Sequence, residues 1–110
     1  LFSAYLYQSM SIWANSEDLP GMSSWLSKQA DEEVEHAKRL HQYITARGGR
    51  TILALIAAPQ DKWDSPLEVM EAALAHEEHI SANFQICNCI INTCSRNYRR
   101  WQVRPVITLP

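Results

Sequence analysis

The stretch QADEEVEHAKRL, residues 29–40, lies at the centre of a segment with a helical pattern that runs from about Pro20 to Arg47. At 1.5 Å per residue this segment predicts a helix about 42 Å long. Residues spaced in steps of three and four form one face of it. That face consists of Leu19, Met22, Leu26, Ala30, Glu33, Ala37, Leu40 and Ile44. Glu33 is therefore a carboxylate at a position that the pattern otherwise gives to apolar side chains.

A second long helix is predicted from Ser65 to about Ile91. The run SPLE at residues 65–68 combines a capping box with proline at the first helical position. The face spaced in steps of three and four consists of Met70, Ala73, Glu77, Ile80, Phe84, Cys87 and Ile91. This face again contains one polar residue, Glu77.

The order of these elements predicts the topology. Residues 1–15 lack Pro and Gly and predict a helix that precedes the two long ones. Asp18 is placed to cap the long helix that begins near Pro20. Residues 48–65 form a longer connection than two neighbouring antiparallel helices need. Fully extended, this connection reaches about 59 Å, which exceeds the predicted helix length. It can therefore leave the two long helices parallel, so we predict an all-α bundle with one long crossover.

Two observations point to metal chemistry. Glu33 and His36 form an E-x-x-H pair, which a helix places on one face, where the two side chains can share a metal ion. Glu33 and Glu77 both interrupt apolar faces, and because burying carboxylates is costly, a hard metal ion in the core would account for both. The alternative is that the faces are slightly rotated and both glutamates lie at a wet boundary. Tyr7 and Trp13 either approach this interior or are simple core residues.

The remaining charged groups predict a solvated surface. The neighbouring charges at residues 32, 35, 38 and 39 are typical of an exposed helix face with i,i+3 and i,i+4 pairs. His41, His76 and His79 have no evident partner and are predicted to be surface histidines.

Length and composition narrow the class of protein. The chain has 110 residues, of which 46% are hydrophobic and 20% charged, with a net charge of −2, which is typical of one globular domain. No apolar run approaches the length of a membrane span, and no signal peptide is evident, so we expect neither a membrane partner nor export. Three cysteines with no disulfide or zinc spacing indicate reduced thiols and a cytoplasmic location.

Acidic residues end at Glu78, whereas residues 79–110 contain four arginines and no acid. The arginines and aromatic residues of this basic tail suggest a nucleic-acid surface, but no recognisable binding motif accompanies them. We therefore predict no nucleic-acid partner and a solvated or disordered tail.

Several blocks of the chain, in this order and spacing, resemble ferritin of the prokaryotic, non-haem type over about residues 1–86. The blocks are SAYLYQSMS at residues 3–11, QADEEVEHAKRL at 29–40, RGGR at 47–50 and APQDKWDSPLEVMEAALAHEE at 58–78. The resemblance implies a ferritin-like four-helix bundle, incomplete in this chain, as residues 1–93, followed by a divergent basic tail, residues 94–110. It further implies a homo-oligomeric cage of 24 subunits that stores iron, and a ferroxidase that oxidises Fe(II) with dioxygen or peroxide.

The resemblance also implies roles for individual residues. Glu33 would bridge two iron ions, His36 would bind the first and Glu77 the second, and Tyr7 would lie beside this di-iron centre. Glu32 and Glu35 match acidic positions where the family binds additional iron. Val34 stands where haem-binding relatives have methionine, so no haem is expected.

The family's other iron ligands have no counterpart in this chain. The first-helix ligand would fall immediately before Leu1, and the acid-free tail cannot supply the acidic segment expected of a fourth helix. Two alternatives therefore stay open: a ferroxidase subunit, and a catalytically inactive helical or cage-building subunit. Whether residues 87–110 are native or out of frame is likewise left open.

Overall fold

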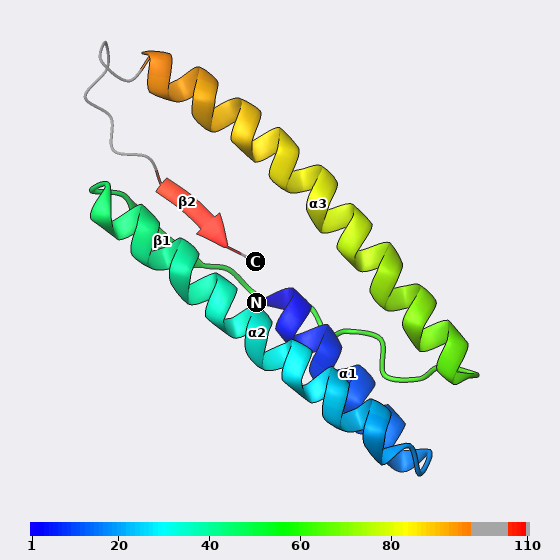
Figure 1. Ribbon diagram of the computed structural model, residues 1–110. Coiled ribbons are helices and arrows are strands. Elements are labelled where there is room, and N and C mark those ends of the chain that lie inside the picture. Colours follow the sequence, from blue (N-terminus) through cyan, green and yellow to red (C-terminus); the bar gives the residue numbers. More distant parts are fainter. Residues whose placement is uncertain (98–105, 110) are drawn as a thin grey trace.

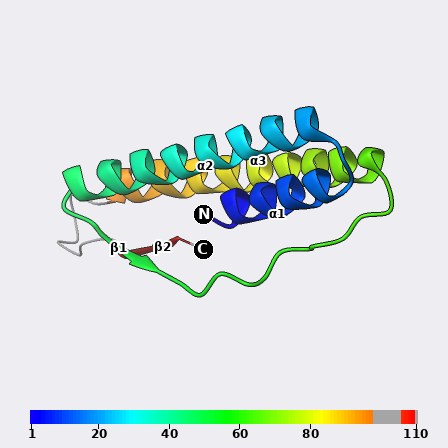
Figure 2. The same cartoon turned by 90° about the horizontal axis from the view of Figure 1, so that it is seen from below.

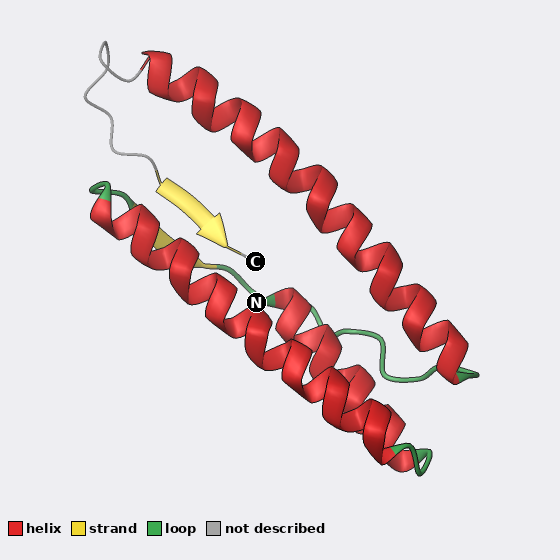
Figure 3. Cartoon of the chain, in the orientation of Figure 1, coloured by secondary structure: helices red, strands yellow, loops and turns green. Residues whose placement is uncertain are grey.

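The computed structural model describes the backbone of residues 1–97 and 106–109, and the side chains of residues 1–83. Along the chain follow the helices and strands α1 (Phe2–Ser16), α2 (Pro20–Ala46), β1 (Arg50–Leu53), α3 (Pro66–Asn97) and β2 (Val106–Leu109). Three helices dominate an elongated molecule of 57 × 21 × 21 Å (Figures 1 and 3). The three predicted helices are present, each within a few residues of its expected bounds except for the end of α3.

A tight turn makes α1 and α2 an antiparallel pair (Figure 1). Asp18 takes a left-handed backbone conformation, with φ at 57°, and the Leu19 amide donates to the Ala14 carbonyl at 2.9 Å. The expectation that Asp18 caps α2 is wrong, because Leu19 is the N-cap and offers no side-chain acceptor. Pro20 starts α2 as expected, where its missing amide hydrogen costs no helical hydrogen bond.

The connection after α2 crosses the full length of the bundle, and α3 runs parallel to α2 (Figures 1 and 2). The predicted long crossover is therefore confirmed. Its end is fixed by the capping box, in which Ser65 Oγ accepts from the Glu68 amide at 3.2 Å. The Glu68 carboxylate reaches back one residue further than expected and accepts from the Asp64 amide at 2.7 Å.

The core lies between α1, α2, the end of the crossover and the first turns of α3. Its buried members are Leu6, Tyr7, Met10, Trp13, Ala14, Leu26, Ala30, Trp63, Val69 and Ala73. On α2 the predicted face is confirmed, since all its residues are buried or half-buried. On α3 the face is rotated, because Val69 is fully buried whereas Met70 is 43% exposed.

Beyond the helices, β1 and β2 form a two-stranded parallel ladder in which Arg50 pairs with Val106 and Leu53 with Leu109. The backbone of α3 continues to Asn97, past the predicted end near Ile91. Residues 94–97 continue α3 and residues 106–109 form β2, so the expectation of a disordered tail is wrong for these residues. Within the described residues, no helix is long and apolar enough to cross a membrane.

Candidate metal centre

Tyr7 and Glu77 connect α1 to α3. The Tyr7 hydroxyl donates a 2.7 Å hydrogen bond to Glu77 Oε1, and Tyr7 is only 3% exposed. Burial raises the pKa of the Tyr7 phenol well above its ordinary value, and the Glu77 hydrogen bond and the charges of Glu77 and Glu33 raise it further. The phenol is thus held protonated, as a donor to the carboxylate.

Glu33 and His36 form the second contact, along α2. His36 Nδ1 lies 3.2 Å from Glu33 Oε1, as helical neighbours spaced by three residues allow. The Glu33 side chain is 22% exposed and His36 is 61% exposed. The charge of Glu33 contributes to the raised pKa of Tyr7, which links the two contacts electrostatically.

The two glutamates lie at a partly solvated boundary. Glu33 is half-buried and Glu77 is exposed, which agrees with the rotated face of α3. Among the residues whose side chains are described, no three His, Cys, Asp or Glu side chains lie close enough together to hold a metal ion. The structure therefore joins the predicted residues in pairs, Tyr7 with Glu77 and Glu33 with His36, and not into one ligand cluster.

The predicted charged face of α2 is confirmed as solvated. Lys38 Nζ donates to Glu35 Oε1 at 2.7 Å, with both side chains more than half exposed. This hydrogen bond and the positive charge of Lys38 lower the pKa of Glu35. Glu32 is also exposed and belongs to the same surface.

Sequence reasoning missed His76. The expectation of a surface histidine is wrong for this residue, which is half-buried and places Nε2 2.8 Å from Ser3 Oγ. The signal that could have found it is its spacing, since His76 follows the buried Ala73 by three residues and precedes the half-buried Ile80 by four. His79 is exposed, as expected, and contacts Asn83 on its own helix.

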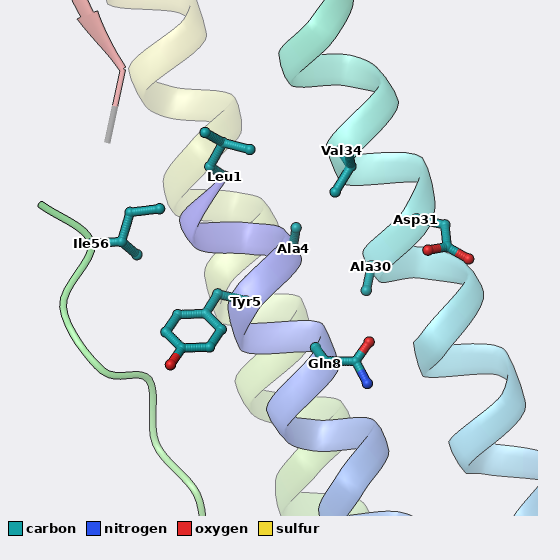
Figure 4. Close-up of a pocket in the computed structure, with 8 residues that line it drawn as sticks. All are labelled: Leu1, Ala4, Tyr5, Gln8, Ala30, Asp31, Val34 and Ile56. Carbon is teal, nitrogen blue, oxygen red and sulfur yellow. The ribbon is translucent and has the colours of Figure 1, made fainter. Parts of the chain in front are cut away.

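A separate depression of about 450 Å³ lies between α1, α2 and the crossover (Figure 4). It is lined by Leu1, Ala4, Tyr5, Gln8, Ala30, Asp31, Val34 and Ile56. None of the four paired residues lines it, so the depression and the candidate metal centre are distinct places on the molecule.

Comparison with known proteins shows which family this chain resembles. A family model described as a ferritin-like domain matches residues 1–87. The soma ferritin of Lymnaea stagnalis is 39% identical over 84 residues, covering 74% of this chain and 48% of that protein. The bacterial non-heme ferritin of Bacteroides fragilis is 38% identical over 81 residues, covering 74% of this chain and 51% of that protein.

Solved structures agree with these relatives. The open-pore ferritin from the hyperthermophilic archaeon Archaeoglobus fulgidus matches with a TM-score of 0.78 at 32% identity, covering 93% of this chain and 65% of that one. This chain spans about half the length of the curated relatives it matches. The family match over residues 1–87 and the identities to these ferritins show that the chain belongs to the ferritin family.

Proposed function

We propose that this chain serves iron storage, oxidising Fe(II) to Fe(III) and sequestering it inside a cage built from copies of the subunit. The observation that carries the proposal is the ferritin-like match over residues 1–87, which contains all of the paired residues of the candidate metal centre. Iron is the substrate, and carboxylate oxygens with one imidazole are donors that suit it in both oxidation states.

Each paired residue has a chemical part in this proposal. Glu33 and Glu77 supply carboxylate oxygens, and His36 supplies a ring nitrogen. The hydrogen bond from Tyr7 occupies Glu77 Oε1, which leaves Oε2 to bind iron. Because its pKa is raised, the Tyr7 phenol remains a hydrogen-bond donor and does not compete as a phenolate ligand. Two Fe(II) ions each release one electron, and dioxygen takes up both electrons and two protons from solvent to leave as hydrogen peroxide.

Further features of the proposal come from the family. The cage is a homo-oligomer of 24 copies, as the resemblance implies, and binds no haem. Residues 1–93 belong to the ferritin-like domain, and residues 94–110 form a basic tail of divergent sequence. Extra iron binds near Glu32 and Glu35, and the location is cytoplasmic.

The test is aerobic oxidation of Fe(II), followed by the ultraviolet absorbance of ferric products. We expect a fast phase in the unmodified chain that Glu33→Gln and Glu77→Gln abolish. Glu78→Gln is the matched control, since it makes the same change on the exposed residue next to Glu77. A fast phase that survives Glu33→Gln and Glu77→Gln would refute the assignment.

A second candidate is a catalytically inactive, cage-building subunit. It is favoured by the lack of a three-ligand group among the residues with described side chains. It predicts assembly without fast oxidation. Light scattering, together with iron analysis of the purified chain, distinguishes the two functions: an assembly that binds no iron supports the inactive subunit.

A further inference from the structure

Two hydrogen bonds join α1 to α3 side by side. On α1 they start from Ser3 and Tyr7, which lie one helical turn apart on the same face. On α3 they end at the adjacent residues His76 and Glu77, with His76 Nε2 2.8 Å from Ser3 Oγ and the Tyr7 hydroxyl 2.7 Å from Glu77 Oε1. Ser3 and Tyr7 are both buried, so the two partners on α1 are fixed within the core.

The imidazole of His76 is also held by Phe2. The two ring centroids lie 5.7 Å apart with the planes tilted by 53°. Consecutive residues of α1, Phe2 and Ser3, therefore both contact the imidazole, Phe2 through its ring and Ser3 at Nε2. This combination restricts the rotamer of His76 more than a hydrogen bond alone would.

The two hydrogen bonds together determine the rotation of α3 and its position along α1. Adjacent residues of a helix project about 100° apart, so the bonds at His76 and Glu77 hold α3 from two directions. A rotation of α3, or a shift along α1, strains at least one of them. With the Ser3–His76 bond removed, Tyr7–Glu77 would be a single pivot, and the Glu77 carboxylate would lose its fixed orientation.

We infer that His76 is a positioning residue for Glu77: its contact with Ser3 and Phe2 fixes the rotation of α3 and thereby holds the Glu77 carboxylate against Tyr7. The effect of this positioning on iron oxidation rests on the proposed function. The positioning itself does not require iron, so it is measured separately from oxidation.

The first measurement is ultraviolet resonance Raman spectroscopy, in which the tyrosine doublet reports the hydrogen bond of the phenol. The Tyr7 contribution is isolated by subtracting the spectrum of Tyr7→Phe. We expect His76→Phe, which keeps the ring beside Phe2 but removes Nε2, to shift this contribution toward that of a phenol in water. Ser3→Ala should do the same, and His76→Gln, whose amide reaches a similar point, should restore the original signal.

His79→Phe is the matched control, because it makes the same change on an exposed histidine of α3 and should leave the Tyr7 signal unchanged. An unchanged Tyr7 signal in both Ser3→Ala and His76→Phe would overturn the inference. If His76→Phe fails to fold, Ser3→Ala alone decides it, since that change removes only a hydroxyl group.

The second measurement is the Fe(II) concentration that gives half the maximal oxidation rate. We expect it to rise about fivefold in His76→Phe, the factor that corresponds to losing one neutral hydrogen bond, and to recover in His76→Gln. An active chain in which this concentration stays constant overturns the positioning role. If the unmodified chain shows no fast oxidation, the proposed function fails, and the Raman result still decides the positioning.

Discussion

Ser11 and Ser23 exchange hydrogen bonds across the α1–α2 pair: Ser11 Oγ donates to the Ser23 carbonyl at 2.8 Å, and Ser23 Oγ donates to the Ser11 carbonyl at 2.9 Å. The two hydroxyl oxygens lie 3.1 Å apart. Small side chains at both positions let the helices approach closely next to the turn. The contact therefore fixes the two helices against each other where the chain reverses.

We predict that Ser11→Ala and Ser23→Ala each lower the free energy of unfolding by about 1 kcal/mol, the usual net value of a lost hydrogen bond. The double variant should cost less than the sum, because either single change already disrupts the shared contact. Urea unfolding measures all three. Ser24→Ala, an exposed neighbour, is the control and should change stability little. Strict additivity would contradict the reciprocal arrangement.

The Tyr7 phenol makes stability depend on alkaline pH. Its pKa is raised in the folded chain, whereas in the unfolded chain it is about 10. Above pH 10 the folded state therefore keeps a proton that the unfolded state loses, so the free energy of unfolding falls as pH rises. Below that pH both states are protonated and the stabilisation is complete.

The measurement is urea unfolding of the unmodified chain and Tyr7→Phe between pH 8 and about 11. Tyr7→Phe should lose less stability over the alkaline part of this range. Tyr5→Phe, which changes an exposed tyrosine on the same helix, is the control. Parallel pH profiles for the unmodified chain and Tyr7→Phe would mean that Tyr7 titrates normally.

Leu26 and Leu74 should differ sharply when truncated. Leu26 is fully buried, and Leu26→Ala should lower the free energy of unfolding by about 3 kcal/mol through lost burial and the cavity left behind. Leu74 is 61% exposed, and Leu74→Ala should stay within about 0.5 kcal/mol. Both changes have the same effect on helix propensity. The difference between their free energies of unfolding, measured by heat or urea, therefore reports the difference in burial. Equal losses of stability in the two variants would mean that Leu26 and Leu74 are buried to the same extent, which contradicts this structure.

Ser65 determines where α3 begins. Ser65→Ala removes the oxygen that accepts from the Glu68 amide and should lower stability by about 1 kcal/mol, as measured by urea unfolding. Ser81→Ala, an exposed position within α3, is the control and should be neutral or slightly stabilising, since alanine favours helix. If both variants behave alike, the capping contact has no role in stability.

Local features of the fold were predictable from sequence. The buried face of α2 follows from spacing alone, because a long helix packed against one neighbour buries one stripe. The capping box at residues 65–68 follows from residue type and order. The parallel course of α2 and α3 follows from the length of the connection between them. Each of these depends on interactions within one segment or on chain length.

The contacts of the candidate site were less predictable, because they depend on how one helix is rotated against another. A shift of one residue along a helix turns its face by about 100°. On α3 the packing of Val69 into the core makes this shift, which leaves Met70 partly exposed and carries His76 toward Ser3. The sequence pattern alone could not distinguish the two rotations, so it identified Tyr7 and Glu77 without predicting their bond.

The order of contacts along the chain has a consequence for folding. The α1–α2 pair joins residues close in sequence, and Ser11 and Ser23 are separated by only 12 positions. Tyr7 and Glu77 are separated by 70, and β1 reaches across the chain to β2. Closing a long loop costs more entropy and slows folding, so we expect the α1–α2 hairpin to form first and α3 to dock late. On this order the Glu33–His36 pair exists before Glu77 arrives, and we expect partial opening of the native chain to separate Tyr7 from Glu77 first.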